Sequence, residues 1–310
     1  MEQPPQTVNP SSLLEINAAL KPDILQCRIG WMRPEFKDPP SFGTVPQEYM
    51  FEGAVVGVVF TRRHETQILG SAVLVAPGLA VTASHILDDE NISEFKGGEM
   101  VLSCFGAALD GAQGWLVNHL QRIPNSDLCL MSMQYIGHFP PSRRLIVAGV
   151  STRTPAVGET IVMGGFRALE PKFLERKEGE PTTLPCSFYM SSGVVTEHHP
   201  AGRGRNRPGP SFSVDCKTLN GMSGGPAFDS RGFVIGIIST GMGDSPTFVA
   251  PIWQALCHAV PGMWRKIFGD DKPRSILELA EREAVTVDGA GAITIQKVGT
   301  GALVQYRFWT

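Results

Sequence analysis

The feature that most constrains the fold of this chain is a succession of short apolar runs with turn residues between them. The runs are rich in Val, Leu and aromatic residues, which is typical of strands, and Gly, Pro and charged residues separate them. The first block comprises 54–60, 67–75, 79–82, 100–105, 114–117 and 128–134, and the second comprises 145–150, 160–164, 187–196, 211–215, 227–228, 233–240 and 247–251. Two blocks of this kind predict an all-β fold of two six-stranded antiparallel barrels with short helices.

The composition agrees with a globular fold of this kind. The chain has 310 residues, of which 42% are hydrophobic and 18% are charged, enough for one large or two small domains with a sizeable core. The 34 glycines and 24 prolines favour turns and short strands over long helices. The net charge of −3 gives no support for binding to nucleic acid or to an acidic membrane surface.

The blocks predict four parts in the chain. Residues 1–50 form an N-terminal extension, 51–140 the first barrel, 141–256 the second barrel, and 257–310 a C-terminal extension with a helix and a hairpin. Helical spacing predicts helices at 11–20, 252–268 and 274–284, although Pro261 interrupts the second. The polar stretches 167–185 and 197–210 predict exposed loops, and 292–296 with 302–308 predict the hairpin.

The cysteines and the N-terminus predict a reducing location. The first residues lack the basic and apolar regions of a secretory signal, and no apolar run approaches the length of a membrane span. The six cysteines are scattered, with no CxxC pair and no metal-ligand spacing. We therefore expect a cytoplasmic protein with free thiols and neither a metal nor a cofactor.

A glycine-rich motif, Gly221-Met222-Ser223-Gly224-Gly225-Pro226, is the first candidate for chemistry. A serine between glycines can present its hydroxyl on a sharp turn, and the backbone N–H groups of Gly221 and Ser223 can stabilise an oxyanion. The alternative is a glycine-rich turn with an idle serine.

A base for this serine is offered by 70–87, which reads GSAVLVAPGLAVTASHIL. It predicts a strand, a Pro-Gly turn and a second strand ending in the small residues before His85. The alternative is a histidine at a strand end with its polar tip in solvent.

An aspartate that orients the base is offered by Asp127, which opens the apolar run after Asn125-Ser126. Its competitors are Asp88, Asp89 and Asp110. The first two lie too close to His85 in sequence to reach behind its ring, and Asp110 has no apolar run after it. An ordinary turn aspartate is the alternative for Asp127.

These motifs, in the order His, Asp, Ser, resemble those of the trypsin-like serine proteases, over about residues 53–256. The stretch 212–223, FSVDCKTLNGMS, resembles the HtrA-like bacterial branch. The resemblance implies two barrels, a catalytic triad of His85, Asp127 and Ser223, and an oxyanion hole from the N–H groups of Gly221 and Ser223. It also implies that Ser239, Thr240 and Gly241 run beside the substrate backbone.

The chain departs from digestive and clotting relatives at two positions. Met222 stands where those proteases have the aspartate that pairs with a new N-terminal amine, and Ile86 replaces the cysteine after the histidine. The fifty or so residues after the barrels are too few for the PDZ domain of HtrA-like proteins. Lys217, six residues before Ser223, lies where the base of the S1 pocket is expected. There it would favour an acidic P1 residue, unless its tip simply reaches solvent.

The sequence thus predicts a serine endopeptidase that acts on protein or peptide substrates through an acyl-enzyme. We expect loops, extensions or a regulatory protein partner to control it, and we expect no nucleic-acid or membrane partner. The alternative is a catalytically silent, trypsin-like binding or scaffold module.

Overall fold

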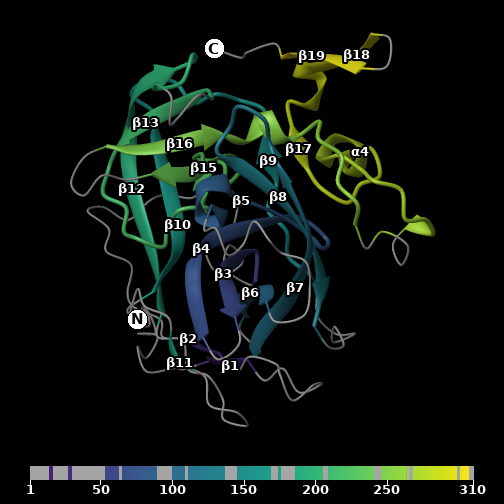
Figure 1. Ribbon diagram of the computed structural model, residues 1–310. Coiled ribbons are helices and arrows are strands. Elements are labelled where there is room, and N and C mark those ends of the chain that lie inside the picture. Colours follow the sequence, from purple (N-terminus) through teal and green to yellow (C-terminus); the bar gives the residue numbers. More distant parts are fainter. Residues whose placement is uncertain are drawn as a thin grey trace, which may run out of the picture.

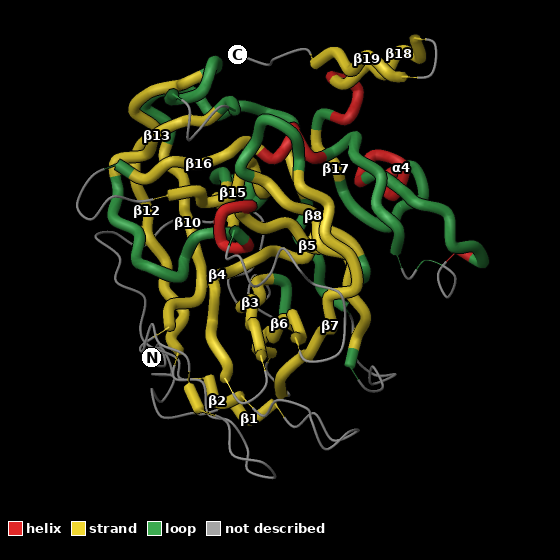
Figure 2. Tube along the Cα trace, in the orientation of Figure 1, coloured by secondary structure: helices red, strands yellow, loops and turns green. Residues whose placement is uncertain are grey.

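Two β-barrels packed side by side make up the body of the molecule (Figure 1). The computed structural model describes residues 14–16, 27–29, 53–62, 65–88, 100–108, 111–136, 145–168, 174–175, 186–204, 209–240, 246–262, 264, 268–298 and 301–306. Strands dominate these residues, and the few helices are short (Figure 2). No described helix has both the length and the apolar character needed to cross a bilayer.

The first barrel is a closed ring of six antiparallel strands. They are β3 (Val55–Arg62), β4 (Glu65–Ala76), β5 (Leu79–Ala83), β6 (Met100–Ala108), β7 (Gly111–Arg122) and β8 (Leu128–Tyr135). The strand order is β4-β3-β6-β7-β8-β5, and pairing of β5 with β4 closes the ring. Closure leaves no free sheet edge within the ring, as expected for a barrel.

The second barrel repeats this plan later in the chain. Its strands are β10 (Thr160–Ala168), β12 (Cys186–His199), β13 (Ser211–Asp215), β14 (Pro226–Phe228), β15 (Val234–Thr240) and β16 (Thr247–Pro251). They follow the order β10-β12-β13-β16-β15-β14, and β14 pairs with β10 to close the ring. The all-β, two-barrel fold predicted from the sequence is therefore confirmed.

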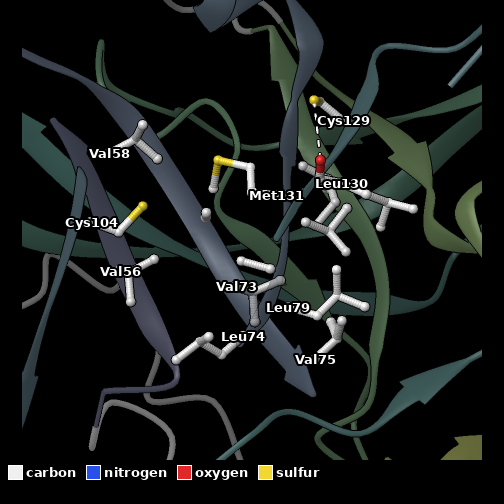
Figure 3. Packing of buried hydrophobic residues seen from close by; sticks show 14 of the residues in the cluster. Val56, Val58, Val73, Leu74, Val75, Leu79, Cys104, Cys129, Leu130 and Met131 are labelled. Atoms are coloured by element: carbon white, nitrogen blue, oxygen red, sulfur yellow. Dashed lines mark hydrogen bonds between the residues drawn. The ribbon is translucent and has the colours of Figure 1, made fainter. Parts of the chain in front are cut away.

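Apolar side chains fill the first barrel (Figure 3). Contributors from five strands include Val56, Val58, Val73, Leu74, Val75, Leu79, Cys104, Leu130 and Met131. An aromatic seam joins this core to the second barrel, because Phe166 of β10 makes edge-to-face contacts with Phe105 of β6 and with Phe188 of β12. The ring centroids lie 5.0 and 5.1 Å apart, within the favourable range for such pairs. The two barrels thus share one apolar interface.

Among the described residues, five short strands and a hairpin lie outside the rings. β9 (Val150–Ser151) pairs in parallel with β15 and with β17 (Val287–Asp288), so the C-terminal extension adds to the second sheet. β11 (Leu174–Glu175) pairs with β4, β1 (Leu14–Ile16) pairs with β2 (Cys27–Ile29), and β18 (Ile293–Val298) pairs with β19 (Gly301–Tyr306). This last pair is the predicted C-terminal hairpin and lies at the yellow end of the chain in Figure 1.

The helix predictions were less accurate than the strand predictions. At 11–20 the described residues form strand β1 instead of a helix. The helix predicted at 252–268 is not continuous: the described residues form the 3₁₀ helix η2 (Ile252–Ala255), residues 258–262 are not helical, and Phe268 is helical again. Pro261, which has no N–H to donate, lies in the break. The third prediction is confirmed in shortened form by α4 (Ile276–Ala280), which Ser275 and Glu278 cap reciprocally. Another short 3₁₀ helix, η3 (Ala290–Ala292), precedes the hairpin.

Both predicted exposed loops are partly structured. Residues 197–199 continue strand β12, and Gly209 is buried against Asn125. Within 167–185, residues 174–175 form β11, which pairs with the first residues of β4, Glu65 and Thr66. Backbone pairing therefore extends further into these polar stretches than their composition suggests.

Candidate active site

His85 lies on a short 3₁₀ helix, η1 (Ser84–Leu87), directly after β5. All five residues of β5 are buried, so the strand fixes the point where η1 begins. The side chain of Ala83, the residue before η1, makes no capping hydrogen bond. Arg122, at the end of β7, donates to the carbonyl oxygens of Ser84 and Leu87, at 3.2 and 2.7 Å. The turn that carries His85 is therefore tied to the neighbouring strand.

Asp127 holds His85 through two hydrogen bonds. The ring Nδ1 of His85 lies 2.8 Å from Oδ2 of Asp127, and its backbone N–H donates to Oδ1 at 2.9 Å. The carbonyl oxygen of Asp127 also accepts from the N–H of Ser84 at 3.0 Å. With Nδ1 directed at the carboxylate, Nε2 is the ring nitrogen that remains for proton transfer.

Among the competing carboxylates, Asp88 pairs with Arg122 at 2.5 Å and is mostly exposed. Asp89 and Asp110 lie outside the described residues. The contacts of Asp127 therefore agree with the preference drawn from the sequence.

Ser239 adds a third donor to the same carboxylate. Its side chain is buried on β15, and its hydroxyl donates to Oδ2 of Asp127. Burial raises the pKa of Asp127, but the hydrogen bond and charge of His85 and the bond from Ser239 outweigh it, so the pKa is lowered. The sequence placed Ser239 beside the substrate and did not reveal this side-chain contact. A hydroxyl near the end of a buried strand was the only available signal.

The loop that carries Ser223 is embedded between the two barrels. Gly224 has a φ of +86°, and a Cβ there would collide with the carbonyl oxygen of Ser71 on β4. Glycine is therefore required at this position. Met222 is buried in the core of the second barrel, whereas Ser223 is partly exposed. The loop thus turns its apolar residue inward and its serine toward the surface.

The backbone N–H groups of this loop differ in whether they are hydrogen-bonded. Those of Met222, Gly224 and Gly225 donate to carbonyl oxygens of Leu219, Ile238 and Met222, at 2.8–3.0 Å. In the described part of the chain, the N–H groups of Gly221 and Ser223 have no acceptor. These are the two groups that the sequence predicted for an oxyanion hole.

The nucleophile loop and the histidine turn meet at Gly70. A Cβ on Gly70 would lie 2.7 Å from the carbonyl oxygen of Ser223 and 3.0 Å from Cδ1 of Ile86, the residue after His85. The absence of a side chain at Gly70 therefore leaves room for both Ser223 and the residue after His85. The three residues of the predicted triad come from distant parts of the sequence to this one region.

The predicted substrate-binding residues are placed less completely. Lys217 is exposed on the segment after β13. On this segment the carbonyl oxygen of Cys216 and the hydroxyl of Thr218 are hydrogen-bonded to Thr247 of β16, at 3.0 and 2.9 Å. Thr240 ends β15 and is partly buried. Gly241 lies outside the described residues. The location of Lys217 in an S1 pocket stays a prediction.

Comparison with known proteins identifies the family. The model of the trypsin-like peptidase domain matches residues 70–237, more than half of the chain, so the chain belongs to the trypsin-like peptidase family. No curated protein matches the sequence.

Comparison with solved structures gives several matches at low sequence identity. The MamO protease domain from Magnetospirillum magneticum is 18% identical, with 66% of this chain and 94% of that chain covered and a TM-score of 0.44. Deg5 is 19% identical, with 70% of this chain and 91% of that chain covered and a TM-score of 0.48. The inactive form of a Ser-to-Ala mutant of Rv3671c from M. tuberculosis H37Rv is 16% identical, with 72% of this chain and 91% of that chain covered and a TM-score of 0.43.

Proposed function

We propose that this protein is a serine endopeptidase with Ser223 as nucleophile. The observation that carries the proposal is the pattern of N–H groups in the loop 221–225. Three of its N–H groups are bonded, while those of Gly221 and Ser223 have no acceptor among the described residues. Backbone donors on the serine and two residues before it, with no acceptor among the described residues, suit a developing oxyanion.

In the proposed reaction, Ser223 Oγ attacks the scissile carbonyl carbon while His85 Nε2 takes the hydroxyl proton. The carbonyl π electrons move onto oxygen, and the N–H groups of Gly221 and Ser223 stabilise that charge. Collapse breaks the C–N bond, and His85 returns the proton to the departing amine. Water then attacks the acyl-enzyme with the same proton transfers, releasing the acid and Ser223. Asp127 keeps His85 in the right tautomer throughout.

The test is labelling by a fluorophosphonate, with the modified residue located by peptide mass spectrometry. We expect labelling of Ser223 in the native chain and none in Ser223→Ala or His85→Ala. Ser213→Ala serves as the matched control, since Ser213 is a buried serine of β13. A folded native chain that neither takes the label nor cleaves peptides would favour the alternative, a trypsin-like binding or scaffold module.

We also propose that the C-terminal extension restrains the activity. Asp288 of β17 accepts from Arg231 at 2.6 Å and from Ser151 at 2.7 Å. Arg231 lies on the hairpin β14–β15, which directly follows the nucleophile loop, so the extension has a physical connection to that loop. Asp288→Asn weakens this connection without removing buried residues. Faster hydrolysis of a small peptide is the expected result, and an unchanged rate contradicts restraint by the extension.

A further inference from the structure

Ser71 is a fully buried polar residue at the boundary between the barrels. It lies on β4 of the first barrel, paired with Gly57 of β3. A serine in the middle of an apolar strand needs hydrogen-bond partners, because an unpaired buried hydroxyl is costly.

The partners of Ser71 belong to the second barrel. Its Oγ accepts from the backbone N–H of Phe166 on β10 at 2.7 Å and donates to the carbonyl oxygen of Gly221 at 2.9 Å. The carbonyl oxygen of Phe166 lies further away, at 3.4 Å, so Gly221 is the better acceptor for the single hydroxyl proton. This one hydroxyl therefore connects β4, β10 and the nucleophile loop.

The backbone of Ser71 also forms a hydrogen bond with the same loop. Its N–H donates to the carbonyl oxygen of Ser223 at 2.8 Å, and its own carbonyl oxygen accepts from Oγ1 of Thr82 at 2.6 Å. The carbonyl groups of Gly221 and Ser223, on either side of Met222, thus both point at Ser71.

These bonds fix the part of the loop that is intrinsically most free. Gly221 has a φ of +96°, and without a Cβ its backbone torsions have a wide allowed range. Ser71 holds the carbonyl oxygens of the peptide groups 221–222 and 223–224. The peptide group between them carries the N–H of Ser223, and the first of them adjoins the residue that carries the N–H of Gly221. The orientation of these two N–H groups, which have no acceptor among the described residues, therefore depends on the anchor at Ser71.

We propose that Ser71 is a positioning residue that holds the N–H groups of Gly221 and Ser223 in the geometry for binding an oxyanion. The proposal rests on the serine-protease function proposed above. Ser71 itself touches no reacting atom; it acts through the carbonyl oxygens of the loop. A loop that shifts by about 1 Å can cost up to about 100-fold in rate.

The kinetic test compares Ser71→Ala with Ser213→Ala, which also removes a buried, hydrogen-bonded hydroxyl but from β13. For Ser71→Ala we expect kcat to fall by about 10- to 100-fold with little change in KM. Inhibition by a peptide aldehyde, which forms an oxyanion on Ser223, should weaken in parallel. Binding of a product peptide should not change. Equal kinetics for the two variants would overturn the proposal.

A second measurement does not need activity. Hydrogen exchange of a peptide covering 219–225 should be faster in Ser71→Ala than in the native chain and in Ser213→Ala. If Ser71→Ala does not fold, Ser71→Cys fills the same space with a weaker hydrogen-bonding group and should show the same changes in smaller degree. Unchanged exchange would refute the anchoring role, even if the native chain proved inactive. If exchange is faster in Ser71→Ala but the native chain is inactive, the anchoring role of Ser71 is supported and the protease function is refuted.

Discussion

Replacing Asp229 by asparagine is expected to destabilise the second barrel. The Asp229 side chain is completely buried at the turn of the hairpin β14–β15. Its Oδ1 accepts from the backbone N–H groups of Arg231 and Phe233, both at 3.0 Å. Its Oδ2 accepts from the guanidinium groups of Arg231 and Arg153, at 2.9 and 3.2 Å. Every side-chain oxygen of Asp229 is thus engaged, and two cations face one carboxylate.

The magnitude follows from these contacts. Removing one partner of a fully buried ion pair costs about 3–5 kcal/mol. The side chains of Arg231 and Arg153 are 45% and 26% exposed and keep Asp288 and Glu159 as other partners, so the lower end, about 3 kcal/mol, applies. For a domain of this size that corresponds to a fall in melting temperature of roughly 6–12 °C.

The assay is thermal unfolding followed by circular dichroism, with Asp215→Asn as the control. Asp215 is an exposed aspartate at the end of β13 in the same barrel, and its loss should change the stability by about 0.5 kcal/mol or less. If the two variants melt at the same temperature, the buried carboxylate is not a stabilising centre of this hairpin and the reasoning is wrong.

Four further outcomes are expected. Asp127→Asn should lower kcat by roughly 10⁴-fold through the wrong histidine tautomer, and near-native turnover would exclude the assignment. Alkylation of the denatured but unreduced protein should modify all six cysteines, in line with the predicted cytoplasmic location, whereas a native disulfide would contradict that prediction. Lys217→Glu should shift the P1 preference from acidic toward basic residues if Lys217 lines the S1 pocket, and an unchanged profile would place it elsewhere. Burial alone would raise the pKa of Glu159, but the hydrogen bond and the charge of Arg153 outweigh burial, so the pKa is lowered. The ion pair therefore stabilises the fold above about pH 4–5, and this stabilisation is lost as the pH falls through the lowered pKa. The melting temperatures of Glu159→Gln and the native chain should therefore differ at pH 6 and converge below pH 4.

The strands of both barrels were readable from sequence because each apolar run is bounded by residues that favour turns. The strand ends were less readable, since pairing carries β12 into the polar residues His198 and His199, whose composition favours a loop. The parallel pairing of Val150 with Val287 could not be foreseen, because two-residue strands carry no periodicity. Its hydrogen bonds, from Val150 N–H to Thr286 and from Thr152 N–H to Asp288, join residues that are far apart in the sequence.

The residues of the candidate site likewise fall into those that the sequence predicts and those that it does not. His85 and Ser223 stand in local motifs whose flanking strands and glycines are visible in the sequence. The contact of Ser71 with Gly221 and the contact of Ser239 with Asp127 were not predicted, because the partners lie 150 and 112 positions away in the sequence. Contacts over such distances are fixed by the closure of the barrels and not by the residues next to each serine.

The pairing of β17 with β9 also sets an order of events during synthesis. The ribosome makes the nucleophile loop and the hairpin β14–β15 well before Asp288, the partner of Arg231. At typical elongation rates of about 5–20 residues per second, the hairpin waits roughly 3–11 s for this partner. During that interval the growing chain has its complete candidate site in sequence but not the last strand of its second sheet. The ion pair between Arg231 and Asp288 therefore forms late in the synthesis of each molecule.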